Sequence, residues 1–159
     1  MQEFNLLNEE LILIRLEAEK REEVLKALAN LLISSGYVKE SFLEAILERE
    51  KVFPTGLPTE GVGVAIPHAD IIHVVKPAIA IGVLNKPVKF SIMGNPEEEV
   101  DVKLVFMLAI NEPTMQINLL KSLVSLFQDK KLLHQLSETK NKKELISILS
   151  RSIKVGILA

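Results

Sequence analysis

The stretch Val102-Lys103-Leu104-Val105-Phe106-Met107-Leu108-Ala109-Ile110 is the longest continuous apolar run in the chain, and only its lysine interrupts it. A run this apolar is typical of a central β-strand that is covered on both faces. Periodicity alone leaves a buried helix open for the same residues. Shorter apolar runs precede it at 62–66, 78–84 and 88–92, so we predict a cluster of strands in the middle of the chain.

Polar segments separate these predicted strands. Asn85-Lys86-Pro87 is expected to form a turn between the second and third of the shorter runs. Residues 94–99, which begin with Gly-Asn-Pro and end in three glutamates, are expected to form a loop before the long strand.

Helical patterns flank the strand cluster on both sides. Apolar residues at helical spacing predict helices at 20–35, about 39–51 and 113–127, with two short helices further on that are capped by Asp129 and Asn141. A β-branched run at 11–16 adds one more strand. The pattern predicts an α/β protein: a single-domain layered structure over residues 1–159, with a mixed β-sheet flanked by helices.

Composition limits the classes of function. The chain has 159 residues, 48% of them apolar, and a formal net charge of −2. This size fits one core, and the charge balance argues against a nucleic-acid surface or a strongly basic membrane-binding patch. Since cysteine is absent, disulfides, thiol nucleophiles and cysteine metal sites are excluded.

The distribution of apolar residues gives no sign of export or membrane insertion. The first residues, Met-Gln-Glu-Phe-Asn, lack the basic and apolar regions of a secretory signal. No uninterrupted apolar run approaches the roughly 20 residues that a membrane span needs. We therefore expect a soluble, cytoplasmic protein.

His68 has the most distinctive setting of the three histidines. It directly follows Pro67, which fixes the backbone, and Ile66 is held extended because it precedes a proline. The imidazole should therefore leave the sheet edge in a defined direction, and at neutral pH it can present an unprotonated nitrogen as a nucleophile. The alternative is a loop histidine with no role.

His73 lies five residues after His68, with Asp70 between them, and this spacing raises the question of a metal site. Nitrogen and carboxylate ligands would suit zinc. His134 falls in a predicted helix far downstream, so nothing points to further ligands and we assign no metal. His73 is expected to flank the site and orient groups around His68, or else simply to end a surface turn.

Arg49 and Thr55 could contact an anion near this histidine. A guanidinium at the end of the second helix can offer paired donors to phosphoryl oxygens, and Thr55 offers a hydroxyl within a turn. By themselves, Arg49 could equally be a solvated surface charge, and Thr55 an ordinary turn residue. The chain has neither a phosphate-binding loop ending in Gly-Lys-Ser or Gly-Lys-Thr nor a Gly-x-Ser-x-Gly elbow.

Taken together, Arg49-Glu50, Phe53-Pro54-Thr55-Gly56 and Val64-Ala65-Ile66-Pro67-His68 resemble the signature of Enzyme IIA of the bacterial sugar phosphotransferase system, fructose/mannitol type. The resemblance extends along nearly the whole chain, and its Ala-Ile-Pro-His core is far more specific than a lone histidine.

The resemblance implies a cytoplasmic phosphocarrier. Such proteins accept phosphate on the motif histidine from the small carrier HPr and pass it to a cysteine of Enzyme IIB. They serve the membrane Enzyme IIC only indirectly. By this resemblance His68 is the phosphorylated residue, Arg49 contacts the phosphoryl group, and Thr55 lies in the same pocket. No metal or organic cofactor is required.

One position departs from the mannitol- and fructose-like pattern. Those members usually carry a second active-site histidine at the start of the helix after the long strand, where this chain has Gln116. A glutamine can hydrogen-bond a phosphoryl oxygen, but it supplies neither charge nor a proton at neutral pH. With His73 and the Phe-Pro-Thr-Gly turn, Gln116 favours the galactitol-type branch.

Three other functions remain open at this point. A regulator similar to the nitrogen-related IIA proteins would bind targets according to its phosphorylation state, although those proteins more often keep the second histidine. A metal-dependent hydrolase would use His68, Asp70 and His73. A plain interaction module would carry no chemistry.

Overall fold

The computed structural model describes residues 6–153 of the chain. Its elements follow in the order 3₁₀ helix η1 (Glu9–Leu11), β1 (Ile12–Leu16), α1 (Arg21–Ser34), α2 (Ser41–Val52), β2 (Gly56–Leu57), β3 (Gly63–Ala65), 3₁₀ helix η2 (Ile71–His73), β4 (Ala78–Ile92), β5 (Asn95–Ala109), α3 (Pro113–Leu126), α4 (Lys130–Glu138) and α5 (Lys142–Ser152).

The long antiparallel hairpin of β4 and β5 organises a five-stranded sheet. β1 runs parallel to β4, and β3 runs parallel to β5. The short strand β2 is antiparallel to β3 and touches the far end of β4. The sheet is therefore mixed, as the sequence predicts, and residues 102–110 contribute its long strand β5 rather than a buried helix.

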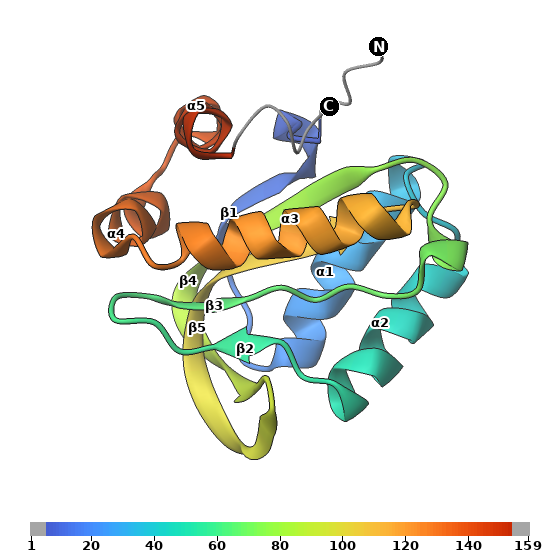
Figure 1. Cartoon of the computed structure of the whole chain (residues 1–159), viewed down its shortest axis with the longest axis horizontal. Helices are drawn as coiled ribbons and strands as arrows, with labels where there is room; N and C mark the ends of the chain where they lie inside the picture. Colours follow the sequence, from blue (N-terminus) through green and yellow to red (C-terminus); the bar gives the residue numbers. More distant parts are fainter. Residues whose placement is uncertain (1–5, 154–159) are drawn as a thin grey trace.

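Helices cover both faces of the sheet (Figure 1). Along β5, Leu104, Phe106 and Leu108 point into the core formed with α3, α4 and α5. The alternate residues Val105 and Met107 point into the core under α1 and α2. Because both faces are buried there, the strand carries apolar side chains at every position from Leu104 to Ala109 instead of alternating with polar ones. The prediction of a layered α/β fold is confirmed.

The prediction of a turn at Asn85-Lys86-Pro87 is wrong, because β4 continues through it as one strand. The pairing with β5 jumps between Val83 and Val88, and within this interval residues 85–87 are exposed to solvent. A bulge accommodates a proline that cannot donate to a neighbouring strand.

The prediction of a loop over residues 94–99 is also wrong, since β5 already begins at Asn95. Only a tight turn at Gly94, with φ of 80°, separates the two strands. Glu99 pairs with Ser91, and the three glutamates are exposed. Here the hairpin extends beyond the covered part of the sheet, so charged side chains can occupy strand positions.

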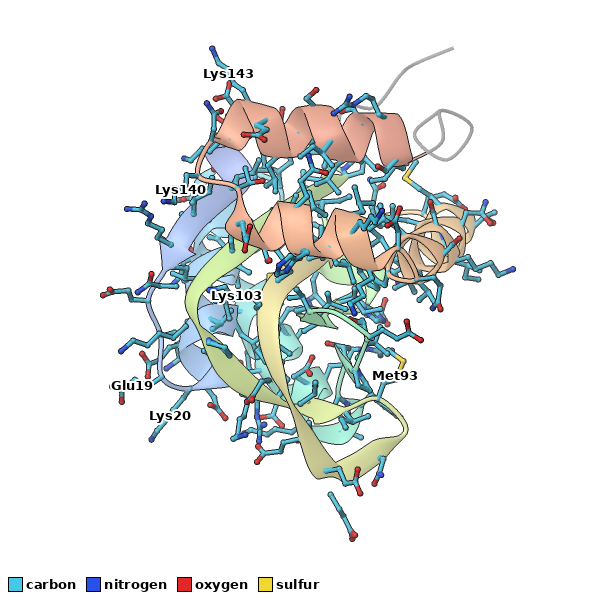
Figure 2. All side chains as sticks on the ribbon, turned by 90° about the vertical axis from the view of Figure 1, so that its left-hand side faces the viewer. Glu19, Lys20, Met93, Lys103, Lys140 and Lys143 are labelled. Carbon is cyan, nitrogen blue, oxygen red and sulfur yellow. The ribbon has the colours of Figure 1, made fainter. Side chains whose placement is uncertain are left out.

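The helix ends agree with the predicted caps. Asp129 accepts a hydrogen bond from Leu132 N, and Asn141 accepts from the amides of Lys143 and Glu144. Figure 2 shows Lys140 and Lys143 projecting outward at the start of α5. Within residues 6–153, no helix has the length and apolar content that crossing a bilayer requires.

Candidate phosphoryl-transfer site

His68 lies just beyond β3, at the edge where β3 and β5 end. Pro67 O accepts a hydrogen bond from Leu108 N at 3.0 Å, and His68 forms an isolated parallel bridge with Leu108. Ile66 is buried in the core, with 1% of its surface exposed. These contacts extend the β3 backbone rigidly to the histidine, whose own side chain is half-buried.

One nitrogen of the His68 ring is already engaged. Nδ1 lies 2.8 Å from the carbonyl oxygen of Ile66. A carbonyl oxygen can only accept, so Nδ1 must carry a proton and donate it. In the neutral ring the lone pair is then on Nε2. The geometry therefore selects Nε2 as the nucleophilic nitrogen.

The surroundings of His68 also favour the neutral ring. Burial lowers the pKa of His68 below its ordinary value of 6.5, and the nearby positive charge of Arg49 lowers that pKa further. The hydrogen bond to Ile66 acts in the opposite direction but is outweighed. At pH 7 the ring is thus mostly unprotonated and able to attack an electrophile.

Arg49 is exposed on the last turn of α2. Its guanidinium carbon lies 5.3 Å from the centre of the Phe53 ring, an arrangement that orients the planar group by cation–π attraction. Because its charge acts on His68, the structure brings together the two residues that the sequence assigned to nucleophile and phosphoryl contact.

Thr55 is buried, with 2% of its surface exposed, and Glu50 holds both of its donors. One carboxylate oxygen accepts from Thr55 N at 2.8 Å, and the other accepts from the Thr55 hydroxyl at 2.9 Å. The geometry gives Thr55 a part in shaping the turn, because its hydroxyl is directed at Glu50.

Glu50 was not among the predicted site residues, although the sequence held a signal for it. Phe42, Ile46 and Glu50 follow one another at intervals of four, so they lie on the same face of α2, and all three are buried. A glutamate on the apolar stripe of a helix indicates a buried carboxylate with a specific partner.

Burial raises the pKa of Glu50 from 4.5 to about 7, although its hydrogen bonds to Thr55 and the charges of Arg21 and Arg49 oppose this. A group with a raised folded-state pKa contributes stability that is fully present below pH 4.5 and is lost as pH rises through about 7. The shift corresponds to about 3 kcal/mol. Ionised Glu50 thus lowers the free energy of unfolding at neutral and alkaline pH.

His73 is directed at the start of α2. Its Nδ1 lies 2.8 Å from Ser41 Oγ, and its carbonyl oxygen accepts from Lys39 N. Asp70 accepts from Ile72 N as the cap of η2. In residues 6–153, no three histidine or acidic side chains are grouped so that they could hold a metal ion. The contacts assign His73 to fixing the loop after His68.

Gln116 lies in the first turns of α3, whose start follows the end of β5 after a short loop. It is part-buried, and its Oε1 is buried without a hydrogen-bond partner among the described residues. Glu112 caps this helix by accepting from Thr114 N and Met115 N. The amino end of α3 therefore presents Gln116 at the same sheet edge as His68.

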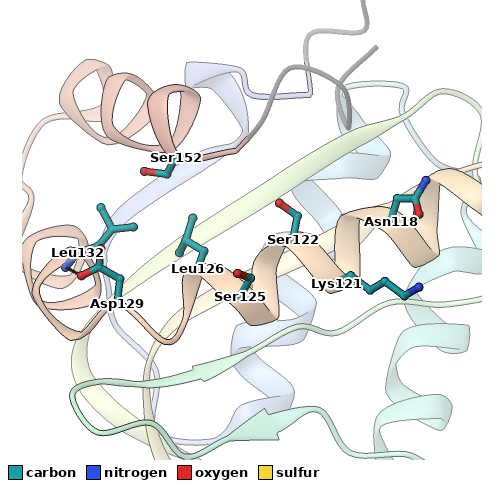
Figure 3. Close-up of a pocket in the computed structure, with 8 residues that line it drawn as sticks. All are labelled: Asn118, Lys121, Ser122, Ser125, Leu126, Asp129, Leu132 and Ser152. Atoms are coloured by element: carbon teal, nitrogen blue, oxygen red, sulfur yellow. Dashed lines mark hydrogen bonds between the residues drawn. The ribbon is translucent and has the colours of Figure 1, made fainter.

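A separate hollow of about 580 Å³ lies between α3, α4 and α5 (Figure 3). Lys121 and three serines contribute most of its polar groups, and Ser152 faces Leu126 across it. The α3 residues that line it begin at Asn118 and do not include Gln116. This hollow is thus distinct from the surface around His68.

At one edge of this mixed sheet, His68 has a free Nε2 and a lowered pKa, and Arg49 lies near it. These features suit a protein that carries an anionic group on an imidazole nitrogen. The family model described as "Phosphoenolpyruvate-dependent sugar phosphotransferase system, EIIA 2" matches residues 5–152. The chain belongs to this family, whose members are phosphotransferase phosphocarriers.

Individual relatives agree with this assignment. The galactitol-specific EIIA component of Escherichia coli K12 is 33% identical over 108 residues, which are 68% of this chain and 71% of that protein. The crystal structure of IIA mannitol from Escherichia coli superposes with a TM-score of 0.76 at 26% identity, covering 90% of this chain and 98% of the other. The complex of enzyme IIA mannitol with phosphorylated IIB mannitol, also from Escherichia coli, gives 0.76 at 24% identity, covering 91% and 97%, and supports the fold alone.

Proposed function

We propose that Nε2 of His68 accepts a phosphoryl group from phosphorylated HPr and passes it to a cysteine of Enzyme IIB. The observation that carries this proposal is the hydrogen bond from Nδ1 to the carbonyl of Ile66, 2.8 Å long. It leaves Nε2 as the nitrogen with a free lone pair, on a ring whose pKa is lowered.

Each transfer exchanges one phosphorus bond for another. The Nε2 lone pair forms a bond to phosphorus as the bond to the donor imidazole breaks, and the donor nitrogen keeps the electron pair. In the second step a thiolate of the acceptor attacks phosphorus, and Nε2 regains its lone pair. The transition state spreads negative charge over three oxygens, and in this proposal the guanidinium of Arg49 and the amide of Gln116 stabilise that charge.

The relatives support our proposal for the partners and the sugar. The mannitol IIA domain of Escherichia coli has been seen bound to phosphorylated IIB, and the equivalent encounter is the one we propose here. The 33% identity to a galactitol-specific component favours galactitol or a related polyol as the sugar delivered by the associated Enzyme IIC. The cycle would run in the cytoplasm, where HPr and phosphoenolpyruvate supply the phosphate.

Incubation with Enzyme I, HPr and labelled phosphoenolpyruvate tests the proposal. We expect one acid-labile phosphate per chain, attached to Nε2 of His68, because Nδ1 is occupied by the Ile66 carbonyl. Heteronuclear NMR of the phosphorylated ring distinguishes the two nitrogens. Absence of label, or phosphate on Nδ1, would contradict the proposal.

We expect a docking surface of exposed apolar side chains on the segments that carry the site residues. Phe53, Ile72, Val75 and Ile117, which we call the apolar rim, are each more than half exposed. Phe53 follows α2, Ile72 and Val75 belong to the segment around η2, and Ile117 is next to Gln116. A carrier must hand its phosphate on, so partners must be able to cover the histidine and exclude water around it.

Replacing Ile117 with glutamate should raise the KM for phosphorylated HPr about tenfold, because a charge replaces an apolar contact at the interface. The melting temperature should stay the same, since Ile117 is exposed. Val124→Glu, two turns further along the same helix, is the matched control. Equal KM values for Ile117→Glu and the wild type would remove Ile117 from the docking surface.

A further inference from the structure

Glu50 is a buried ionisable group that the transfer chemistry described above does not use. Only 6% of its surface is exposed, whereas Glu48, Arg49 and Lys51 on the same turn are exposed. A cavity of about 160 Å³ adjoins it, lined by Arg21, Glu22 and Leu25 of α1, Leu47 and Lys51 of α2, and Ser91 of β4.

The contacts of Glu50 join the end of α2 to the start of β2. Its carboxylate accepts from both donors of Thr55, five residues further along the chain. Next in sequence, Gly56 packs so tightly on β4 that a Cβ there would lie 2.5 Å from Ser91 O. Gly56 O also accepts from Met93 N. The turn that follows Arg49 is thus fixed at both ends.

This turn determines where the guanidinium of Arg49 lies relative to His68. Phe53, on which the guanidinium stacks, is in the turn, and its amide donates to Arg49 O at 2.7 Å. β2 then pairs with β3, which leads directly to His68. Loosening the Glu50–Thr55 contact would therefore move the arginine and the histidine relative to each other.

An ionised carboxylate satisfies both donors of Thr55 as the structure arranges them. The N–H and the O–H of Thr55 face two separate carboxylate oxygens, and both oxygens accept. The N–H can only donate, whereas the hydroxyl can also accept, so a glutamine or a protonated acid would be held only by reversing the hydroxyl. Burying a charge costs stability. We therefore explain the carboxylate by the turn that it holds in place.

We propose that ionised Glu50 is a positioning residue for phosphoryl transfer: by holding both donors of Thr55 it fixes the turn from Arg49 to Gly56, so that the guanidinium faces His68. This inference rests on the proposed function of His68. Glu50 itself touches neither the phosphoryl group nor the nucleophile.

The proposal predicts that the rate of phosphoryl transfer depends on pH. The charged groups facing Glu50 are Arg21 and Glu22 from α1, and Arg49 and Lys51 from α2. With a pKa of about 7, Glu50 loses its proton as pH rises from 6.5 to 8, and its ionised fraction increases about fourfold. Burial lowers the pKa of His68 below 6.5, so its ring is mostly unprotonated throughout this range.

The test compares Glu50→Gln with Glu48→Gln, an exposed glutamate on the same helix whose ion pair with Lys51 is a surface one. The measurement is kcat/KM for phosphorylated HPr between pH 6.5 and 8.5. The wild type and Glu48→Gln should rise about fourfold, as the ionised fraction does. Glu50→Gln should be about tenfold slower at pH 8, because the site is misplaced, and should change less than twofold with pH. A wild-type pH profile in Glu50→Gln overturns the proposal.

Two further measurements separate this inference from the proposed function. Thr55→Ser keeps both donors and should behave as the wild type, whereas Thr55→Val loses the hydroxyl and should slow transfer. The Thr55 amide resonance in the unphosphorylated wild type should titrate near pH 7 and cease to do so in Glu50→Gln. An amide that does not titrate overturns the role of Glu50 even where His68 is labelled. If the wild-type protein is not phosphorylated, the proposed function is overturned. The titration of the Thr55 amide then still decides whether Glu50 holds the turn.

Discussion

Replacing His68 with alanine is expected to abolish phosphorylation by HPr completely. The ring supplies the only nitrogen lone pair that we propose bonds to phosphorus, so no slower route remains through neighbouring groups. The backbone contacts at this position, the bridge to Leu108 and the bond from Leu108 N to Pro67 O, do not involve the side chain. The fold should therefore persist, as circular dichroism can verify.

His68→Asn makes the same test with less disturbance. Its amide N–H can donate to Ile66 O in place of Nδ1, but nothing replaces Nε2. This variant should fold as the wild type and take no label. His134→Ala is the matched control, because His134 is exposed on α4, where its Nε2 lies 3.5 Å from a carboxylate oxygen of Glu138. Its labelling should match the wild type.

If the His68→Ala variant is still phosphorylated, the phosphate must be attached to another residue. The chain has three histidines, so His73 would be the next candidate. His73→Ala should keep its label on His68, because its ring is paired with Ser41 at the start of α2. Tandem mass spectrometry of the labelled peptide under neutral conditions assigns the residue in each variant.

The fold followed from features that sequence shows locally. Residues 102–110 predicted the buried strand, and Asp129 and Asn141 predicted the starts of two helices. The errors came from the β4–β5 hairpin, where Pro87 and the run Glu97 to Glu99 read as loop signals. Both belong to strands, because a bulge and a solvent-exposed ribbon tolerate proline and charge. Pairing over a long hairpin overrode local propensity there.

The site was predictable only as far as a motif could identify residues. His68 and Arg49 could be named from sequence, whereas the nitrogen that reacts could not, because it depends on the 2.8 Å contact of Nδ1 with Ile66 O. The buried position of Glu50 could have been deduced from its spacing after Ile46. Its hydrogen bonds with Thr55 depend on how the chain turns after α2, and the hydrophobic periodicity of the sequence does not reveal this turn.

Replacing Arg49 with alanine is expected to reduce kcat/KM for transfer from phosphorylated HPr by about 10²- to 10³-fold. In our proposal the guanidinium stabilises charge that develops on the phosphoryl oxygens, and losing one such preorganised donor costs about that much in other enzymes. Arg49→Lys should fall between the two, since it keeps the charge but loses the planar pair of donors. Melting temperature should change little, because Arg49 is exposed.

A second readout shows whether the arginine acts directly at His68. Its charge lowers the pKa of His68, so NMR titration of that ring should give a higher pKa in Arg49→Ala than in the wild type. Lys143→Ala, which removes an exposed cation at the start of α5, should leave both the rate and that pKa unchanged. A slow Arg49→Ala variant with a wild-type pKa at His68 would mean that the guanidinium binds the partner protein instead of facing the histidine.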